Sequence, residues 1–260
     1  MERENVHLWT REQAEKDQDK VLVKARHFRK GFGDTEILSD VSFDLKEGEN
    51  MVVLGKSGTG KSVLIKSMVG LHKPDGGELN VLGQDLKDME GEDLRELRRK
   101  VGYLFQGGAL YDSMTVRDNM RFPLERQVER KPEDEIEELV EEGLKSVGLL
   151  DAIDKMPAEL SGGMQKRIAL ARTLILRPKI MLYDEPTTGL DPVTSKEISK
   201  LLMEMRDRYN ITSIIVTHDI SSAQLTADRI HILRDGTLDI QGSFDELANS
   251  DDEWVRAFFE

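Results

Sequence analysis

The sequence predicts an α/β fold, in which helices cover both faces of a parallel or mixed sheet. Two observations predict it. The apolar run 51–54 is followed directly by a glycine-rich loop and a helical segment. The apolar runs 180–183 and 211–217 lie on either side of a helical stretch at about 193–209, which is the order of a βαβ unit. Strands in such a unit are parallel, and their carboxyl ends gather where ligands bind.

Near the start of the chain, alternating apolar and polar residues predict two partly exposed antiparallel strands. The apolar positions are Val21, Val23 and Ala25 in the first strand and Val41, Phe43 and Leu45 in the second. The next strand differs, because Met51–Leu54 is apolar at four successive positions, which is typical of a strand buried on both faces. A helix is expected to follow from Gly60 to about Val69.

An amphipathic helix is predicted in the middle of the chain, between Pro132 and Gly148. Its apolar residues recur at helical spacing, at Ile136, Leu139, Val140, Leu144 and Val147. The remaining positions are mostly Glu and Asp, and acids in the first turn suit the positive end of the helix dipole. The acidic run 133–142 is therefore expected to be a solvated helix face.

The last predicted elements are a helix and a hairpin. Ser161 is a typical N-cap residue, and a helical apolar pattern follows it until Pro178 ends the helix. The runs 229–233 and 237–240 flank Asp235-Gly236, a dipeptide that favours a tight hairpin turn.

Composition narrows the class of protein. The chain has 260 residues, of which 38% are hydrophobic, enough for one substantial core with an inserted subdomain. A net charge of −13 disfavours a general nucleic-acid coat, so we expect no nucleic-acid partner. The absence of cysteine excludes disulfides, thiol nucleophiles and cysteine-ligated metals, and favours the cytosol. No apolar run approaches the roughly 20 residues of a membrane span, and residues 1–20 are expected to form a charged extension.

The glycine-rich loop matches the pattern G-x-x-x-x-G-K-[ST] of phosphate-binding loops. It comprises Gly55, Lys56, Ser57, Gly58, Thr59, Gly60, Lys61 and Ser62, and the next residue, Val63, completes the predicted nucleotide site. Glycines let backbone N–H groups face phosphate oxygens, Lys61 can reach the β- and γ-phosphates, and the Ser62 hydroxyl is suited to Mg²⁺. The alternative, a glycine-rich turn with a surface lysine, is disfavoured by the strand and helix on either side. By itself the loop leaves kinases, GTPases and helicases open.

A pair of acids follows the predicted strand 180–183. Asp184 and Glu185 would lie at the carboxyl end of a parallel strand, beside the phosphates. Asp184 is suited to holding Mg²⁺, and Glu185 to polarising the attacking water as a general base. In isolation, an acidic turn that caps a core strand is the better interpretation. The phosphate loop upstream favours the catalytic one.

A second anion-binding helix start is predicted at Leu160-Ser161-Gly162-Gly163-Met164-Gln165-Lys166-Arg167. A serine followed by two glycines there provides a hydroxyl and close-packed backbone N–H groups. Together with the phosphate loop, this motif resembles the ATP-binding cassette (ABC) ATPases of ABC transporters. In that family an LSGGQ-type signature closes over the ATP held by the P-loop of a second subunit. Here the motif reads LSGGM, with glutamine one place later.

The resemblance, which covers about residues 21–240, implies a fold and a division of the chain. The fold is a P-loop NTPase core of the RecA-like type with a mixed sheet, an N-terminal antiparallel β-subdomain and an inserted α-helical subdomain. The ABC domain would span residues 21–245, with the helical subdomain at about 107–177 and a C-terminal segment at 246–260. Residues 1–20 depart from the usual family pattern.

The resemblance also assigns roles to single residues. It implies that Ser161, Gly162 and Gly163 contact the ATP of the second copy. It implies that Gln106 is the Q-loop glutamine, which contacts Mg²⁺ and the attacking water and links the core to the helical subdomain. Asp191 matches the D-loop at the dimer interface and joins the implied ATP site.

Two further residues, His218 and Phe32, each have a structural interpretation beside the functional one. A lone histidine such as His218 is more often an ordinary strand-end residue, but its place 33 residues after Glu185, at another strand terminus, favours the family's switch histidine at the γ-phosphate. Phe32 takes the place of the aromatic that stacks on adenine, and could instead cover the core. The implied catalytic group is Glu185, His218, Lys61 and Gln106, the implied Mg²⁺ ligands are Ser62, Gln106 and Asp184, and the implied ligand is ATP.

A longer stretch points to one subgroup of the family. Residues 105–119, which read FQGGALYDSMTVRDN, resemble the ATPases of the Mla and Mce phospholipid transport systems. Pro123-Leu124, residues 191–194 and the end of the chain at 255–259 support the same subgroup. The resemblance implies two copies of this chain beneath an integral-membrane permease, peripheral at the cytoplasmic face of the inner membrane. An MCE-domain lipid-binding protein and, in Mla systems, a STAS-domain protein are further implied partners.

Three alternatives stay open. The chain could be the ATPase subunit of another ABC importer or exporter, since neither substrate nor direction is readable from this subunit. It could be a non-transport ABC-type ATPase, although the single cassette and the 100 residues between Lys61 and Ser161 without sustained heptads disfavour the translation and DNA-repair types. A non-enzymatic scaffold is disfavoured by the intact Lys61, Glu185 and His218.

Overall fold

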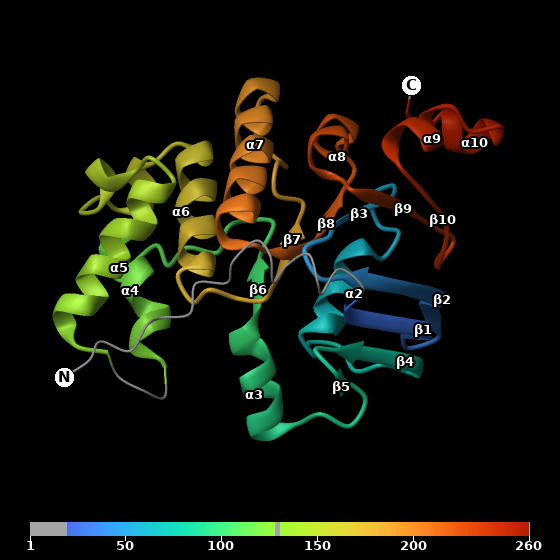
Figure 1. The fold of residues 1–260 in the computed structure, drawn as a ribbon, viewed down its shortest axis with the longest axis horizontal. Coiled ribbons are helices and arrows are strands. Elements are labelled where there is room, and N and C mark those ends of the chain that lie inside the picture. The colour runs from blue at the N-terminus through green and yellow to red at the C-terminus, as the bar shows by residue number, and fades with distance from the viewer. Residues whose placement is uncertain (1–19, 128–130, 260) are drawn as a thin grey trace.

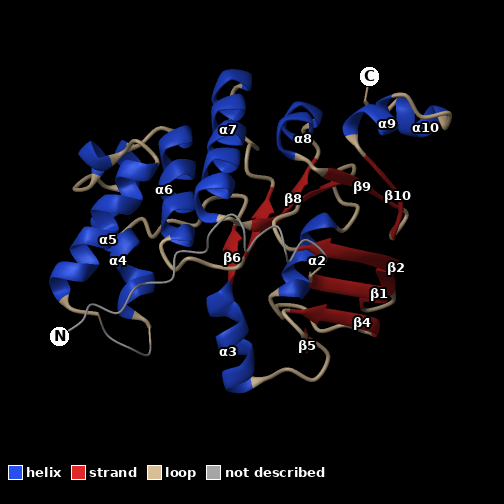
Figure 2. Ribbon diagram, in the orientation of Figure 1, coloured by secondary structure: helices blue, strands red, loops and turns tan. Residues whose placement is uncertain are grey.

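The computed structural model describes residues 20–127 and 131–259, so residues 1–19 of the predicted charged extension lie outside the described residues. The strands of the described residues, drawn in red in Figure 2, form a ten-stranded sheet in the order β5-β4-β1-β2-β10-β9-β3-β8-β7-β6. Helices lie on both sides of the sheet, and a group of helices lies beyond its β6 end (Figure 1). This arrangement confirms the predicted α/β fold with a mixed sheet.

The part of the sheet from β9 to β6 is parallel. It comprises β9 (Arg229–Arg234), β3 (Asn50–Leu54), β8 (Thr212–Thr217), β7 (Ile180–Asp184) and β6 (Val101–Leu104). Neighbouring strands in this part all pair in parallel. Helix α7 (Pro192–Tyr209) lies between β7 and β8 in the chain, which confirms the predicted βαβ unit. The carboxyl ends of these strands consequently meet at one edge of the sheet.

The parallel strands are buried on both faces, as the apolar run at positions 51–54 predicts. Val52 and Leu54 belong to one core, which contains residues of α7 and of α8 (Ile220–Thr226). Met51 and Val53 belong to a second core, which contains residues of α2 (Lys61–Met68) and α3 (Gly91–Lys100). Because successive side chains point to opposite faces, one short strand serves both cores.

The other part of the sheet is antiparallel, as the alternating residues predict. It contains β1 (Val21–Phe32), β2 (Thr35–Lys46), β4 (Gly76–Val81) and β5 (Gln84–Asp85), and the last two have no counterpart in the sequence prediction. Strand β10 (Thr237–Gly242) pairs antiparallel with β9 and lies beside β2, so it joins the two parts. Asp235 and Gly236 make the predicted hairpin turn with φ of 49° and 79°.

A group of three helices packs together beyond β6 (Figure 1). It contains α4 (Val116–Glu125), α5 (Glu133–Ser146) and α6 (Gly162–Leu174), with 3₁₀ turns at Leu150–Ala152 and Pro157–Glu159. Helices α5 and α6 begin directly after Pro132 and Ser161, where the sequence predicts them. Helix α4 has no counterpart in the prediction. The group lies inside the helical subdomain that we propose for residues 107–177.

The acidic face of α5 is only partly solvated. Glu138 is exposed, as predicted. Glu133 and Glu137, however, form ion pairs with Arg121 of α4 at 2.5 and 2.6 Å, and Glu137 also pairs with Arg117. Glu133 nevertheless stays exposed, as predicted, whereas the prediction of a solvated face is wrong for the partly buried Glu137. The cations that face Glu137 belong to a helix that the sequence pattern does not reveal.

The last two helices of the described residues are α9 (Phe244–Ala248) and α10 (Glu253–Arg256). Phe259 packs against Phe244 with ring centroids 5.3 Å apart, and Phe258 against Trp254 at 5.9 Å. Helix α9 crosses the predicted boundary between residues 245 and 246, so we propose that the C-terminal segment starts at its N-cap, Ser243. Within the described parts of the chain, no helix combines the length and the apolar character that crossing a membrane requires.

Candidate active site

Four segments that are far apart in the sequence meet at the carboxyl edge of the parallel strands. The phosphate loop follows β3, Asp184 is the last residue of β7, His218 follows β8, and Gln106 comes two residues after β6. In the sheet, β7 lies between β6 and β8, and β8 lies next to β3. The parallel pairing therefore gathers the segments that carry the predicted catalytic residues.

The phosphate loop wraps around the ammonium group of Lys61. Lys61 Nζ donates hydrogen bonds to the carbonyls of Gly55 and Lys56 at 2.8 and 3.1 Å, and only 5% of the residue is exposed. Gly60 has a φ of 102°, and a Cβ there would lie 2.7 Å from Ile37 Cγ2, so only glycine fits. Among the described residues, no side chain caps the N-terminus of α2. The backbone N–H groups of this turn can therefore bind an anion.

Ser62 and Asp184 place two oxygen donors next to the loop. Ser62 Oγ donates to Asp184 Oδ1 at 2.7 Å, and the hydroxyl of Tyr103 donates to Asp184 Oδ2 at 2.8 Å. Burial raises the pKa of Tyr103, and the charge of Asp184 raises it further, so Tyr103 stays a protonated donor. Hydroxyl and carboxylate oxygens are the hard ligands that Mg²⁺ prefers, usually one or two from the protein with water and phosphate completing the shell. The pair fits such an ion. The described residues contain no group of three or more His, Asp or Glu side chains that could enclose a metal by themselves.

Glu185 is a buried carboxylate surrounded by hydrogen-bond donors. Its Oε2 lies 2.8 Å from His218 Nδ1, which carries the hydrogen because a carboxylate can only accept, and it also accepts from the hydroxyls of Thr188 and Thr217 at 3.2 and 3.3 Å. Its Oε1 lies 3.3 Å from Lys61 Nζ. Burial raises the pKa of Glu185, but the hydrogen bond from His218 and the charge of Lys61 outweigh it, so the pKa is lowered overall. The group is ionised at neutral pH, as a general base must be.

The backbone of Glu185 is strained. Its φ of 49° lies in the left-handed region, which is unusual for a residue other than glycine. The conformation is fixed by a hydrogen bond of 2.9 Å from the Glu185 N–H to the carbonyl of Val216 on the neighbouring strand. Strand β8 thus holds the residue in the conformation in which its carboxylate meets Lys61 and His218.

The predicted signature residues make their contacts elsewhere in the chain. Ser161 is exposed and caps α6, because its Oγ accepts from the Met164 N–H at 3.3 Å. A Cβ on Gly163 would lie 2.7 Å from Thr194 Cγ2, so the turn lies close against the start of α7. Asp191 caps α7, and hydrogen bonds from Thr194 lower the pKa of its carboxyl group. The predicted D-loop and signature therefore lie side by side in one chain.

The site residues thus form two groups. We call Gly55–Ser62 with Asp184, Glu185 and His218 the P-loop half, and Ser161–Gly163 with Asp191 the signature half. Among the described residues, no hydrogen bond joins the groups of one half to those of the other. Val63, in the first turn of α2, adjoins the P-loop half.

Phe32 lies at the end of β1 with 47% of the residue exposed. Its ring meets that of His72 edge to face, with centroids 5.0 Å apart, and Lys30 Nζ lies 5.2 Å from its centroid. Burial lowers the pKa of His72, and the charge of Lys66 lowers it further, so the imidazole is neutral at neutral pH. Nearly half of the residue stays exposed beside these contacts, which leaves ring area for another planar ring. Its exposure disfavours the alternative that Phe32 simply covers the core.

Several residues at the site have no role in the sequence prediction. Tyr103 binds Asp184, Thr188 and Thr217 bind Glu185, and Lys166 binds the loop at Gln106. Three of them lie in segments that the sequence singles out: Thr217 ends a predicted strand, Thr188 lies in the D-loop run, and Lys166 lies in the signature motif. No pattern distinguishes them from structural residues, because their importance depends on which acid or carbonyl they meet.

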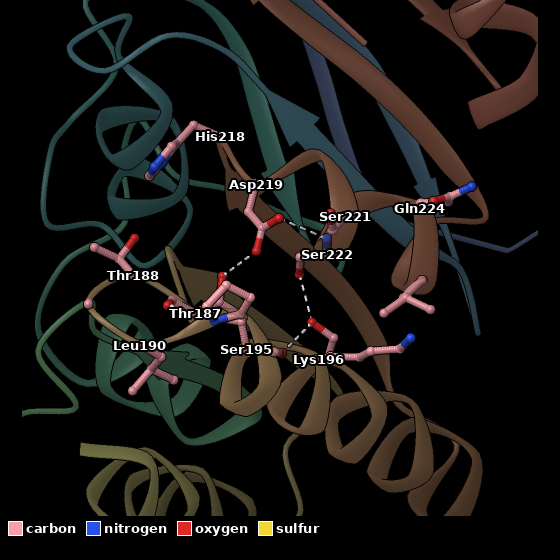
Figure 3. A pocket seen from close by; sticks show the side chains of 14 residues that line it. Thr187, Thr188, Leu190, Ser195, Lys196, His218, Asp219, Ser221, Ser222 and Gln224 are labelled. Atoms are coloured by element: carbon pink, nitrogen blue, oxygen red, sulfur yellow. Dashed lines mark hydrogen bonds between the residues drawn. The ribbon is translucent and has the colours of Figure 1, made fainter. Parts of the chain in front are cut away.

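A cavity of about 700 Å³ opens beside His218, between the start of α7 and α8 (Figure 3). Its wall includes Thr187 and Asp219, which are joined by a hydrogen bond of 3.1 Å, and the hydroxyls of Ser199 and Ser222, which lie 3.0 Å apart. The cavity therefore borders the P-loop half at His218 and reaches the D-loop residues that precede Asp191.

The sequence comparisons agree with this geometry. The family model described as "ABC transporter" matches residues 38–188. The "Probable ribonucleotide transport ATP-binding protein mkl" of Mycobacterium leprae is 42% identical over 92% of this chain and 68% of its own length. The "Methionine import ATP-binding protein MetN" of Clostridium tetani is 38% identical over 87% of this chain and 70% of its own. The "Intermembrane phospholipid transport system ATP-binding protein MlaF" of Haemophilus influenzae is 36% identical over 93% of this chain and 90% of its own.

Solved structures share the fold. The cbiO1 protein of Clostridium perfringens, described as part of the ABC transporter complex cbiONQ, has a TM-score of 0.82 at 33% identity and covers 91% of this chain and 94% of its own. The dimeric ATP-binding cassette MJ0796, solved in a post-hydrolysis state with ADP and Pi, has a TM-score of 0.77 at 32% identity and covers 85% of this chain and 98% of its own.

Proposed function

The chain belongs to the ABC transporter family and is an ATPase, and from that premise we propose that two copies of it bind two ATP and power a membrane permease. One observation carries the proposal. The ammonium of Lys61 and the ionised carboxylate of Glu185 lie 3.3 Å apart at the end of parallel strands, which is where a phosphate and an attacking water would meet. The geometry offers both charge neutralisation and a base.

ATP would be held mainly by the P-loop half. The backbone N–H groups of the loop and the Lys61 ammonium would neutralise the phosphates, and Phe32 would stack on the adenine. Ser62 and Asp184, with Gln106 as a third candidate, would hold Mg²⁺. When bound, Mg²⁺ supplies positive charge to the phosphate oxygens.

Hydrolysis would use Glu185 and the groups that hold it. Glu185 would accept a proton from the attacking water as the water oxygen bonds to the γ-phosphorus and the bond from that phosphorus to the β-phosphate oxygen breaks. The positive charges of the P-loop half would stabilise the leaving ADP. His218 binds Glu185 through Nδ1, which leaves its other ring nitrogen for the γ-phosphate. Gln106 would contact the same region from the end of β6.

The signature half would serve the ATP of a second copy. Ser161 and Gly162 are exposed at a helix N-terminus, where a hydroxyl and backbone N–H groups can bind an anion. The dimeric cassette MJ0796 with ADP and Pi supports a two-copy arrangement. Closing of one copy on the other would complete two ATP sites, each with a P-loop half and a signature half.

The permease would dock in a groove between the sheet and the helical group. The groove has a volume of about 440 Å³ and is lined by residues of β6, the loop after it, α4 and α6. Leu71, Phe105 and Tyr111 expose apolar area there, between 41% and 49% of each residue. Because Gln106 directly follows Phe105, movement of the Q-loop would displace a permease segment bound in this groove. Attachment through a permease would place the chain at the cytoplasmic face of the inner membrane.

We propose phospholipid as the cargo. The run 105–119 resembles the Mla and Mce subgroup, and the MlaF relative, whose name includes intermembrane phospholipid transport, matches over nearly its whole length. The relatives named for ribonucleotide transport and methionine import are as similar, which keeps another ABC importer as the second candidate. The phospholipid proposal adds an MCE-domain protein and a STAS-domain protein as partners.

Isolation of the transporter tests this assignment. A tagged chain expressed from its own locus would be purified from detergent-solubilised membranes. We expect a permease and an MCE-domain protein to accompany it, and the reconstituted complex to move a fluorescent phospholipid between vesicles when ATP is present. The matched Glu185→Gln complex should assemble and move none. A solute permease with a soluble binding protein, and ATPase activity stimulated by methionine or a ribonucleotide, would contradict the phospholipid assignment.

A further inference from the structure

A buried lysine in α6 holds the loop that contains Gln106. Lys166 lies in the second turn of α6, just after the signature residues, and only 8% of it is exposed. Lysine is rarely buried unless its ammonium has a partner. Here Lys166 Nζ donates a hydrogen bond to the backbone carbonyl of Gln106. The contact joins the signature helix to the loop after β6.

The surroundings of the ammonium include the two acids of the P-loop half. Burial lowers the pKa of Lys166, and the negative charges of Asp184 and Glu185 oppose this by favouring the charged form. A cation at this point therefore attracts both acids and binds the carbonyl of Gln106. Removing the cation would remove the attraction and the hydrogen bond together.

A second cation of α6 binds the same loop further along. The guanidinium of Arg172 donates to the carbonyls of Gly108 and Ala109 at 3.1 and 2.8 Å. A Cβ on Gly108 would lie 3.3 Å from the Cβ of Ala169, so the loop lies close against the helix. Between them, Lys166 and Arg172 bind three carbonyls of residues 106–109. Of the two cations, Lys166 is the one that the negative charges of Asp184 and Glu185 stabilise.

We propose that Lys166 is a positioning residue that fixes Gln106 beside Asp184 and Glu185 and couples this position to the signature half of the same chain. The inference rests on the proposed function, in which Gln106 meets the γ-phosphate region and Ser161 meets the ATP of the second copy. Movement of α6 that opens or closes the signature half would carry the Q-loop with it. The chain's own ATP site would then respond to the state of the neighbouring one.

Hydrogen exchange of the full-length protein without nucleotide tests the positioning directly. The Gly108 N–H donates to the Phe105 carbonyl at 2.8 Å, so the loop contains an amide that exchange can follow. In Lys166→Met, peptides covering residues 105–109 should exchange about tenfold faster, because the charged hydrogen bond is lost. Lys166→Arg should restore slow exchange. Lys200→Met, the same change at an exposed position of α7, is the matched control and should exchange like the parent protein.

Kinetics give the second readout. With Lys166→Met, kcat for ATP hydrolysis should fall about tenfold while the Kd for ATP changes little, since a misplaced Q-loop affects chemistry more than binding. Unchanged loop exchange and unchanged kcat would overturn the inference. Faster exchange throughout the protein, or no rescue by Lys166→Arg, would show that Lys166 contributes only to folding and would also overturn the inference. If the Lys166→Met variant does not fold, Lys166→Gln repeats the test. Failure of the parent protein to hydrolyse ATP would contradict the proposed function and leave the exchange result as a separate test of the contact.

Discussion

The two halves of the ATP site are built in different ways. In the P-loop half, Lys61, Asp184 and Glu185 are buried and are linked to one another or to neighbouring side chains by hydrogen bonds and ion pairs. In the signature half, Ser161 and Asp191 are exposed and use their oxygens to cap helices of their own chain. The parallel sheet therefore positions a complete set of interacting charges within one chain, whereas the signature helix leaves its groups exposed at the surface. A surface of this kind needs a second copy to become part of a site.

The largest effect is expected from the base of the P-loop half. Glu185→Gln removes the proton acceptor but keeps the side-chain shape, so kcat should fall about a thousandfold while ATP binding is retained. Steady-state hydrolysis and equilibrium binding of ATP measure the two quantities. The variant should also accumulate ATP-bound dimers. Rapid turnover by Glu185→Gln would show that another group is the base.

Acid should weaken the P-loop half before the signature half. His231 lies in β9, paired with Val53 of the strand that leads into the P-loop, and is 1% exposed. Burial lowers the pKa of His231 from 6.5 to about 4, and the charge of Arg229 contributes. The unfolded chain therefore binds the proton first, so the free energy of unfolding falls as pH drops from 6.5 to about 4, by about 3 kcal/mol in total.

Denaturant unfolding at several pH values measures this loss, and His231→Leu should remove most of it. Hydrogen exchange at low pH should show faster opening of β9 and β3 than of α6. An equal pH dependence in the parent and in His231→Leu would contradict the account of this residue.

The cation of the P-loop half should control affinity. Lys61→Ala removes a buried charge that would pair with phosphate, so the Kd for ATP should rise about a hundredfold. Lys200→Ala, a change at an exposed lysine, is the control and should bind ATP like the parent protein. Titration with a fluorescent ATP analogue gives both constants. Normal affinity in Lys61→Ala would contradict the assignment of the phosphate loop.

The smallest effect is expected in the signature half and should leave single-chain affinity intact. Gly163→Ala places a methyl group 2.7 Å from Thr194 Cγ2, so the turn or the threonine must shift. We expect kcat to fall about tenfold with little change in the Kd for ATP. Adding Thr194→Ser removes the obstructing methyl, keeps the hydroxyl that binds Asp191, and should recover most of the loss. Weaker ATP binding by Gly163→Ala alone would contradict the claim that the P-loop half determines the affinity of a single chain for ATP.

Much of the P-loop half could be predicted from the sequence, because it depends on local rules. A strand that is apolar at every position, a glycine-rich loop and acids at the end of a second such strand are each visible in a few residues. Parallel pairing then brings Ser62 to Asp184, as the structure shows at 2.7 Å. The signature helix is visible for the same reason, since Ser161 and its glycines mark a helix start.

Contacts between elements could not be predicted. The ion pairs of Glu133 and Glu137 depend on α4, and the hydrogen bond from Tyr103 to Asp184 depends on the register of β6 against β7. The contact of Lys166 with Gln106 joins residues 60 positions apart. Such pairs are set by packing in three dimensions, for which a single sequence has no periodic signal.

The central claim is that one ATP is held by the P-loop half of one copy and the signature half of another. The chain has no cysteine, so introduced cysteines give an unambiguous crosslink. Two differently tagged chains in the Glu185→Gln background would be mixed, one with Thr59→Cys and the other with Ser161→Cys, and oxidised with and without ATP. The account predicts a disulfide between the two tagged chains that forms only when ATP is bound. ATP binding without any crosslink between the chains would contradict it.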